Sequence, residues 1–112
     1  MERTIVIYER LGGSSPFLDW LLGLKDAKAR AMVRARLNRV QLGNFGDCKS
    51  IGEGVFELRI SYGPGYRVYF GRDGEVVVVL LCGGNKGTQQ RDIAKAKVLW
   101  KEYKNAIKKL SS

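Results

Sequence analysis

The sequence predicts a single α+β domain with an N-terminal strand and helical hairpin, an antiparallel β-meander, and a C-terminal helix packed on the sheet. Three observations predict this fold. Two early segments repeat apolar residues at helical spacing, a middle segment alternates apolar and polar residues between glycine-containing turns, and the last segment returns to helical spacing. A chain of 112 residues fits one domain, so residues 1–112 form a single unit in this prediction.

The N-terminal part predicts one strand and two helices. Residues 4–8 are a short β-branched run that is typical of a strand. Ser15 and Pro16 are typical of an N-cap followed by proline at the first helical position, which predicts a helix over residues 16–24. A second helix is predicted over residues 26–42, where apolar residues recur at helical spacing until a glycine and an asparagine end it. These two helices should form a hairpin.

The middle of the chain predicts three strands. Residues 56–62 alternate apolar and polar side chains, and residues 66–70 repeat the alternation, as expected of half-buried strands. Residues 63–65 and 72–74 contain glycine and form the turns. Residues 76–81 are continuously apolar, which predicts a central strand covered on both faces.

The last helix, predicted over residues 90–110, has one apolar stripe that should pack on the sheet. Basic residues fill the rest of its surface. The whole chain has 20 Lys and Arg against 11 Asp and Glu, a net charge of +9. In so small a domain this charge favours an acidic partner such as nucleic acid, an anionic membrane surface or an acidic protein, and a solubilising surface is the plain alternative.

Several classes of site and location are excluded by composition. The chain has no histidine, which excludes His-based triads, His metal sites and imidazole acid–base pairs. Two isolated cysteines do not make a zinc site, so we expect no metal and no cofactor. No apolar run approaches the roughly 18 residues of a membrane span, and the N-terminus lacks the features of a signal peptide. We therefore expect a cytoplasmic protein with no membrane partner.

A glycine-rich segment follows the predicted central strand and leads into the last helix. Glycines at positions 83, 84 and 87 would let backbone N–H groups approach a phosphate, and Lys86 lies among them. The spacing matches neither a P-loop nor a dinucleotide-binding fingerprint. The segment by itself therefore predicts only an anion site.

Two arginines can be placed near this segment from the strand pairing. If the apolar residues of the first hairpin share one core face, a three-residue loop pairs Tyr62 with Tyr66 and makes Arg59 and Arg67 diagonal neighbours, about 7–8 Å apart. Two guanidiniums at that spacing repel each other unless an anion, a carboxylate or solvent lies between them. The face opposite the core then carries Arg59, Ser61, Arg67 and Tyr69.

Lys86 follows the strand that lies beside the one bearing Arg67, so Arg59, Arg67 and Lys86 should share one concave face. Each residue also has a structural interpretation. Arg59 could pair with Glu57 or Glu53, Arg67 could simply cover the sheet, and Lys86 could be a solvated loop lysine.

These residues carry a family resemblance. Glu57-Leu58-Arg59, then Gly65-Tyr66-Arg67-Val68-Tyr69, then Gly83-Gly84-Asn85-Lys86-Gly87-Thr88-Gln89 resemble the RelE/ParE toxin superfamily, most closely its HigB-like, phage Gp49-related branch called addiction module killer protein. The resemblance covers nearly the whole chain and implies a RelE-like domain. It also implies the toxin of a type II toxin–antitoxin system, silenced by a co-encoded helix-turn-helix antitoxin that is HigA-like.

The resemblance implies two alternative activities. RelE- and HigB-like members cleave mRNA in the ribosomal A site, whereas ParE-like members poison DNA gyrase. We predict the first, a ribosome-dependent endoribonuclease whose partners are mRNA in the A site and ribosomal RNA, because gyrase inhibition needs no phosphate-cleaving cations. The ParE-like gyrase inhibitor and a non-catalytic RNA-binding module stay as alternatives.

RNA cleavage without a metal proceeds by attack of a 2′-OH on the neighbouring phosphate and needs a proton acceptor, charge stabilisation and a proton donor. Without histidine, these roles fall to cations and tyrosines. In our hypothesis Arg67 and Arg59 bind the scissile phosphate, and Lys86 stabilises the transition state or donates the proton. The RelE pattern implies functional roles for Arg67 and Lys86. Expected RNA-binding residues are Lys49, Tyr69, Gln89, Arg91 and Lys95.

Overall fold

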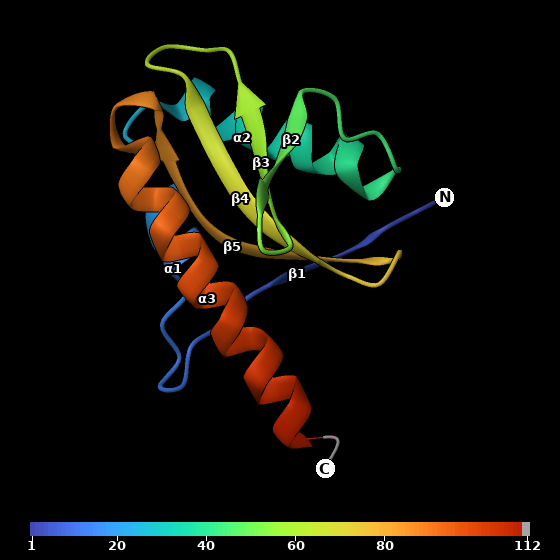
Figure 1. Cartoon of the computed structure of the whole chain (residues 1–112). Helices are drawn as coiled ribbons and strands as arrows, with labels where there is room; N and C mark the ends of the chain where they lie inside the picture. Colours follow the sequence, from blue (N-terminus) through green and yellow to red (C-terminus); the bar gives the residue numbers. More distant parts are fainter. Residues whose placement is uncertain (111–112) are drawn as a thin grey trace.

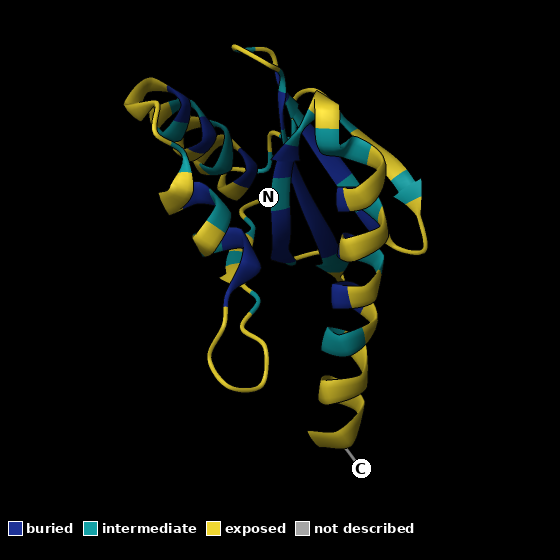
Figure 2. Cartoon of the chain, turned by 90° about the vertical axis from the view of Figure 1, so that its left-hand side faces the viewer, coloured by how far each residue is buried: buried dark blue, intermediate teal, exposed yellow. Residues whose placement is uncertain are grey.

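The structure, a computed structural model, describes residues 1–110 and has three layers. A five-stranded sheet lies between a helical hairpin on one face and a long C-terminal helix on the other (Figures 1 and 2). Among the described residues, no helix has both the length and the apolar character that a membrane crossing needs. The elements are β1 (Thr4–Ile7), α1 (Pro16–Gly23), α2 (Ala27–Gln41), β2 (Cys48–Gly52), β3 (Val55–Ile60), β4 (Tyr66–Asp73), β5 (Val77–Asn85), the short 3₁₀ helix η1 (Lys86–Thr88) and α3 (Gln89–Leu110).

The strand order is β1-β5-β4-β3-β2, with β1 parallel to β5 and every other pair antiparallel. The predicted α+β class, the helical hairpin, the meander and the packing of α3 on the sheet are confirmed. β2 was missed by the sequence prediction. It is a short edge strand with three exposed residues of five, so it has no apolar face and is held by backbone pairing with β3.

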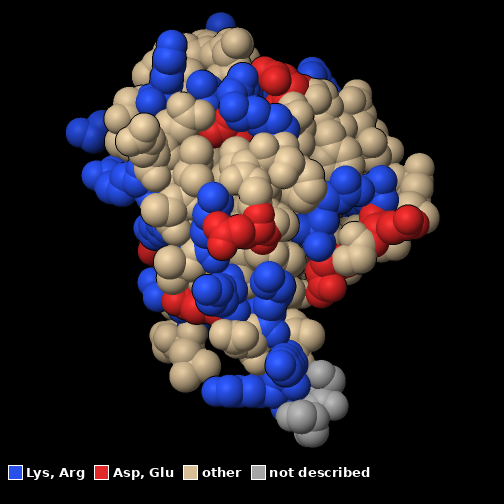
Figure 3. All heavy atoms as spheres, viewed as in Figure 1, with Lys and Arg blue, Asp and Glu red and all other residues tan. Residues whose placement is uncertain are grey.

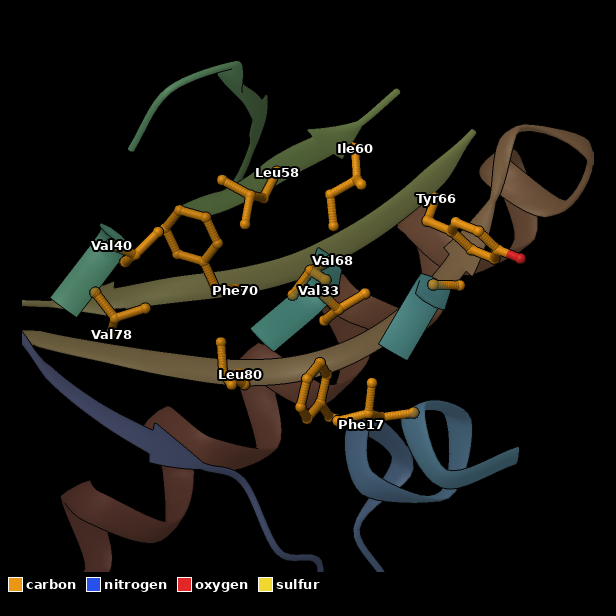
Figure 4. Close-up of a cluster of buried hydrophobic side chains, with 12 residues drawn as sticks. Phe17, Val33, Val40, Leu58, Ile60, Tyr66, Val68, Phe70, Val78 and Leu80 are labelled. Atoms are coloured by element: carbon orange, nitrogen blue, oxygen red, sulfur yellow. The ribbon is translucent and has the colours of Figure 1, made fainter. Parts of the chain in front are cut away.

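Two separate cores cover the two faces of the sheet. Val78 and Leu80 of β5 belong to the core under α1 and α2, whereas Val79 and Leu81 belong to the core under α3. This division confirms that the continuously apolar strand is central and covered on both faces. Burying one such side chain stabilises the fold by about 1.5–3 kcal/mol. Figure 4 shows the first core, which gathers Phe17, Val33, Val40, Leu58, Ile60, Tyr66, Val68, Phe70, Val78 and Leu80.

The β3–β4 hairpin has a register two residues away from the predicted one. Ile60 pairs with Tyr66, so Arg59 lies directly opposite Arg67 rather than diagonal to it. The loop is longer than predicted because Tyr62 belongs to the turn: its N–H donates to the Ile60 carbonyl, and its hydroxyl donates to Asp26 at 2.8 Å. A shift of two residues leaves every strand side chain on its predicted face, so the predicted core face is confirmed while the offset is wrong.

The predicted position of Ser61 is also wrong. It lies outside β3, in the exposed loop, and does not share the polar face with the two arginines.

Asp26 connects this loop to the start of α2. Its carboxylate accepts hydrogen bonds from the Lys28 and Ala29 backbone N–H groups at 2.9 and 3.3 Å and from the Tyr62 hydroxyl at 2.8 Å. The Tyr62 bond is the largest cause of a pKa below the ordinary 3.8, and it outweighs the opposing effect of desolvation. Ionised Asp26 therefore stabilises the fold above that pH, and the stabilisation is lost as the pH falls through the folded-state pKa.

We expect Asp26→Asn to lower the melting temperature at neutral pH, because asparagine still caps the helix but carries no charge. The difference from the unmodified protein should shrink as the pH falls below 3.8, where Asp26 itself becomes neutral. Thermal unfolding followed by circular dichroism across this range measures the effect. A difference that stays constant with pH would contradict the assigned charge effect.

Candidate active site

Two arginines face each other on the side of the sheet that α3 covers. Arg59 of β3 pairs directly with Arg67 of β4. Both alternate with residues of the first core, so their side chains lie on the opposite face, near the N-terminal end of α3. Directly opposed residues have Cβ atoms about 4.5–5.5 Å apart, and like charges at such positions destabilise a sheet. The pair therefore needs a compensating anion.

Glu57 supplies this anion from within the protein. Its side chain is 0% exposed. Arg59 donates from Nε to Oε1 at 2.9 Å, and Nε of Arg67 lies 3.8 Å from the same oxygen. The other oxygen, Oε2, accepts from the Tyr69 hydroxyl at 3.1 Å and from Nε2 of Gln89 at 2.7 Å. A carboxylate that relieves the repulsion between the two arginines is thus present within the protein. Arg59 forms an ion pair with Glu57, which is one of the structural interpretations that the sequence allowed.

The protonation states of Glu57 and Tyr69 follow from this network. Burial by itself raises the pKa of Glu57, but the hydrogen bonds from Arg59, Gln89 and Tyr69 together lower it below its ordinary 4.5. Burial and the neighbouring Glu57 charge raise the pKa of Tyr69 far above its ordinary value. At neutral pH the carboxylate is therefore ionised, and the phenol is a neutral hydrogen-bond donor.

The predicted third cation lies beside the pair. A side chain at Gly65 would contact Nη1 of Arg67 at 3.4 Å and Cβ of Lys86 at 3.7 Å, so the Gly65 backbone lies next to both residues. The Lys86 backbone N–H donates to the Gly65 carbonyl at 2.9 Å. The Lys86 side chain is exposed and makes no ion pair within residues 1–110. The fold thus gathers Arg59, Arg67 and Lys86, the three predicted catalytic residues.

The predicted role of the glycines is wrong. β5 extends to Asn85, so Gly83 and Gly84 lie inside the strand. A side chain at Gly83 would collide with the Trp20 ring, and one at Gly84 would collide with the Asp92 carboxylate. These two glycines are needed for close packing, and the Gly87 N–H donates to the Asn85 side chain at 2.8 Å rather than being free for a phosphate.

An open hollow lies at η1 and the first turn of α3, and Gln89, one of its lining residues, donates to the Glu57 carboxylate that Arg59 also binds. Its volume is about 580 Å³. The residues that line it are Lys86, Gly87, Thr88, Gln89, Gln90 and Arg91. The side chains of Lys86 and Arg91 therefore give this hollow cationic character.

The predicted RNA-binding residues occupy different positions. Lys49 is exposed on β2 and lies opposite Glu57 in the register, rather than opposite either arginine. Gln89 binds Glu57. Arg91 and Lys95 line a second hollow of about 560 Å³, together with Trp20 and other residues. A role in RNA binding stays a prediction for Lys49, Gln89, Arg91 and Lys95.

The prediction that Tyr69 contacts RNA directly is wrong. Its side chain is 0% exposed and lies in the core under α3, so in this structure the phenol contacts Glu57 and cannot contact a ligand. Glu57 is the residue of this site that sequence reasoning did not select. A signal for it exists, because Glu57 and Arg59 occupy alternate positions around Leu58 and so share one face.

Other reactive groups are sparse. Within residues 1–110, no three side chains of His, Cys, Asp or Glu gather closely enough to hold a metal ion. Cys82 is buried, and burial raises the pKa of its thiol to about 12, so it is not a nucleophile at neutral pH.

Comparison with known proteins identifies the family. The family model described as "Phage derived protein Gp49-like (DUF891)" matches residues 19–108, which include every residue of the site described above. An uncharacterized protein of Haemophilus influenzae is 54% identical over 86 residues, 77% of this chain and 87% of that protein. Gp49-like proteins are generally toxins of toxin–antitoxin systems, and membership implies an antitoxin partner. The chain therefore belongs to the phage-derived Gp49-like family, within the RelE/HigB-like toxins.

Proposed function

We propose that this protein is the toxin of a type II toxin–antitoxin pair of the HigB-like branch and acts as a metal-free, ribosome-dependent mRNA endoribonuclease. The observation that carries the proposal is the direct pairing of Arg59 with Arg67 beside the exposed Lys86. Three cations at one end of a sheet face suit a phosphate whose negative charge grows in the transition state. A co-encoded helix-turn-helix antitoxin would silence the toxin.

In the proposed reaction the 2′-oxygen attacks the adjacent phosphorus and the bond from phosphorus to the 5′-oxygen breaks. The products are a 2′,3′-cyclic phosphate and a free 5′-hydroxyl. The two guanidiniums bind the non-bridging oxygens, since planar bidentate donors fit phosphate. Lys86 is exposed and donates a proton to the leaving 5′-oxygen or stabilises its charge.

The site residues do not supply an obvious acceptor for the proton of the 2′-OH. Glu57 is completely buried and Tyr69 is neutral and buried, so neither can reach a 2′-OH in this structure. This deficit supports ribosome dependence, because ribosomal RNA would position the message and bring a proton acceptor into the site. Free RNA should be cleaved poorly.

The surface charge supports contact with ribosomal RNA. α3 has seven basic residues and two acidic ones, and Figure 3 shows basic side chains along its length. Such contacts release counterions, so association with the ribosome should weaken steeply as salt rises. Arg91 and Lys95, on the first turns of α3, extend this basic surface from the hollow beside Lys86.

The test is to induce the chain in a bacterial host and to map mRNA 5′ ends by primer extension. Wild-type protein should create new cuts within translated messages. Lys86→Ala should lower cleavage on the order of 10²-fold or more, the range expected for a lost acid–base group. Lys25→Ala removes the same charge from the loop between α1 and α2 and should leave cleavage unchanged.

Two other results would replace the proposal. Intact mRNA with arrested replication and an SOS response would assign a ParE-like action on DNA gyrase. Intact mRNA with normal growth would exclude both activities and leave a non-catalytic RNA-binding module.

A further inference from the structure

We infer that Glu57 is a positioning residue: a buried counter-ion that fixes Arg59 by a hydrogen bond, so that its outer nitrogens face the ligand, and that holds Arg67 nearby by charge. The ligand's identity as an RNA phosphate rests on the proposed function, whereas the positioning rests on the contacts alone.

Glu57 cannot take part in the chemistry directly. It has no exposed surface, and both of its oxygens are occupied by protein donors. A 2′-OH could not approach either oxygen without displacing Gln89 or Arg59. Glu57 can therefore act only through the groups that it holds.

The hydrogen bond to Glu57 sets the direction in which Arg59 points. Its Nε donates to Glu57, and its side chain is 34% exposed. Its two terminal nitrogens donate no hydrogen bond to any other residue between 1 and 110. Because the guanidinium is planar, fixing Nε on the carboxylate turns the edge formed by the terminal nitrogens away from Glu57. That edge is the one that can bind a phosphate in a bidentate manner.

Arg67 is held less firmly than Arg59. The Nε of Arg67 lies 3.8 Å from Glu57, too far for a hydrogen bond, and it is buried without a partner among the described residues. Nη1 donates weakly to the Tyr66 carbonyl at 3.3 Å. Arg67 is thus held mainly by charge and can shift towards a phosphate, whereas Arg59 is fixed by a direct hydrogen bond.

The Glu57 carboxylate is itself fixed by hydrogen bonds to its other oxygen. Tyr69 belongs to the core under α3, and Gln89 is the first residue of α3. Their two hydrogen bonds to Oε2 connect the arginines to the packing of the helix on the sheet. The orientation of Arg59 is therefore set before any ligand binds.

The experiment compares Glu57→Gln with Glu53→Gln. Glutamine keeps the volume and one acceptor oxygen but removes the charge. Glu53 lies between β2 and β3, is exposed and forms an ion pair with Lys97 at 3.3 Å, so its replacement makes the same change in net charge outside the site. The readouts are hydrogen exchange of the arginine Nε–H groups by NMR, titration with inorganic phosphate, and kcat and KM for mRNA cleavage on programmed ribosomes.

We expect Glu57→Gln to accelerate exchange of the Arg59 Nε–H about tenfold or more, because its charge-assisted hydrogen bond is lost. Inorganic phosphate should bind as tightly as before or more tightly, since a neighbouring negative charge is gone. Cleavage should fall about 10- to 100-fold in kcat with little rise in KM, as expected for misplaced catalytic groups. Glu53→Gln should change none of these quantities.

Unchanged protection of the Arg59 Nε–H in Glu57→Gln would overturn the inference, as would a kcat equal to that of Glu53→Gln. If Glu57→Gln fails to fold, Tyr69→Phe decides, because it removes one hydrogen bond to the carboxylate and keeps the buried ring. Faster Arg59 Nε–H exchange in that variant supports the inference, and unchanged exchange overturns it. If the wild-type protein cleaves no RNA, the proposed function fails, and the exchange and phosphate measurements still decide the role of Glu57.

Discussion

Replacing Arg67 with alanine is expected to lower mRNA cleavage on the order of 10²–10³-fold, the usual cost of losing one preorganised donor to a developing negative charge. The residue lies directly opposite Arg59 and beside Lys86, at the centre of the cation group. The fold should survive, because Glu57 keeps its hydrogen bonds from Arg59, Tyr69 and Gln89. Primer extension on programmed ribosomes measures the rate, and thermal unfolding checks the fold.

Arg67→Lys separates charge from geometry. Lysine keeps the positive charge but not the planar pair of donors, so cleavage should fall nearly as far as in Arg67→Ala if the bidentate contact matters. Full activity of the lysine variant would show that charge alone suffices. Full activity of the alanine variant would remove Arg67 from the mechanism.

Trp100→Ala is expected to destabilise the fold by about 3–5 kcal/mol, the usual cost of removing a large aromatic side chain from a core. The side chain is 5% exposed, and its ring stacks on Tyr103 with centroids 5.2 Å apart. It also covers Gly71 and Gly54, where an added side chain would lie against the indole. Small domains have only about 5–15 kcal/mol of stability in total, so this variant should be partly unfolded at physiological temperature.

A double-mutant cycle with Gly71→Ala tests whether the indole is placed as described. In the unmodified protein a methyl group at position 71 would collide with the Trp100 ring, so Gly71→Ala should be destabilising. In the Trp100→Ala background the methyl group enters the vacated space. The two changes should therefore be non-additive by about 0.5–3 kcal/mol.

Denaturant unfolding measures all three variants of the cycle. Val98→Ala serves as the control on the same helix, because Val98 is 57% exposed and its truncation should cost no more than about 0.5 kcal/mol. Additive effects of Trp100→Ala and Gly71→Ala would contradict the contact between these residues.

Patterns within one segment were predicted well. The alternation in residues 56–60 and 66–70 placed their apolar side chains on one face, and the continuously apolar strand was correctly taken as central. Such patterns are local because each records whether a side chain meets the core or solvent. The offset of the β3–β4 hairpin was wrong, because Tyr62 is held in the turn by Asp26, a residue 36 positions away.

The glycines of β5 and the strand β2 were also mispredicted because contacts between distant residues decide them. Gly83 and Gly84 look like a phosphate cradle in sequence, but the structure needs them small because Trp20 and Asp92 pack against them. β2 has no apolar face to mark it and is defined by the hydrogen bonds of its neighbour. A sequence pattern cannot distinguish a glycine needed for conformation from one needed for packing.

The sequence by itself determined the α+β class, the faces of the strands, the choice of Arg59, Arg67 and Lys86 as a group, and the absence of histidine chemistry. Only the tertiary structure decided that a buried carboxylate lies between the arginines and is held by the first residue of α3. The physical reason is distance along the chain: the hydrogen bond from Gln89 to Glu57 joins residues 32 positions apart. That contact exists only after the helix has packed on the sheet, and no local pattern of residues records it.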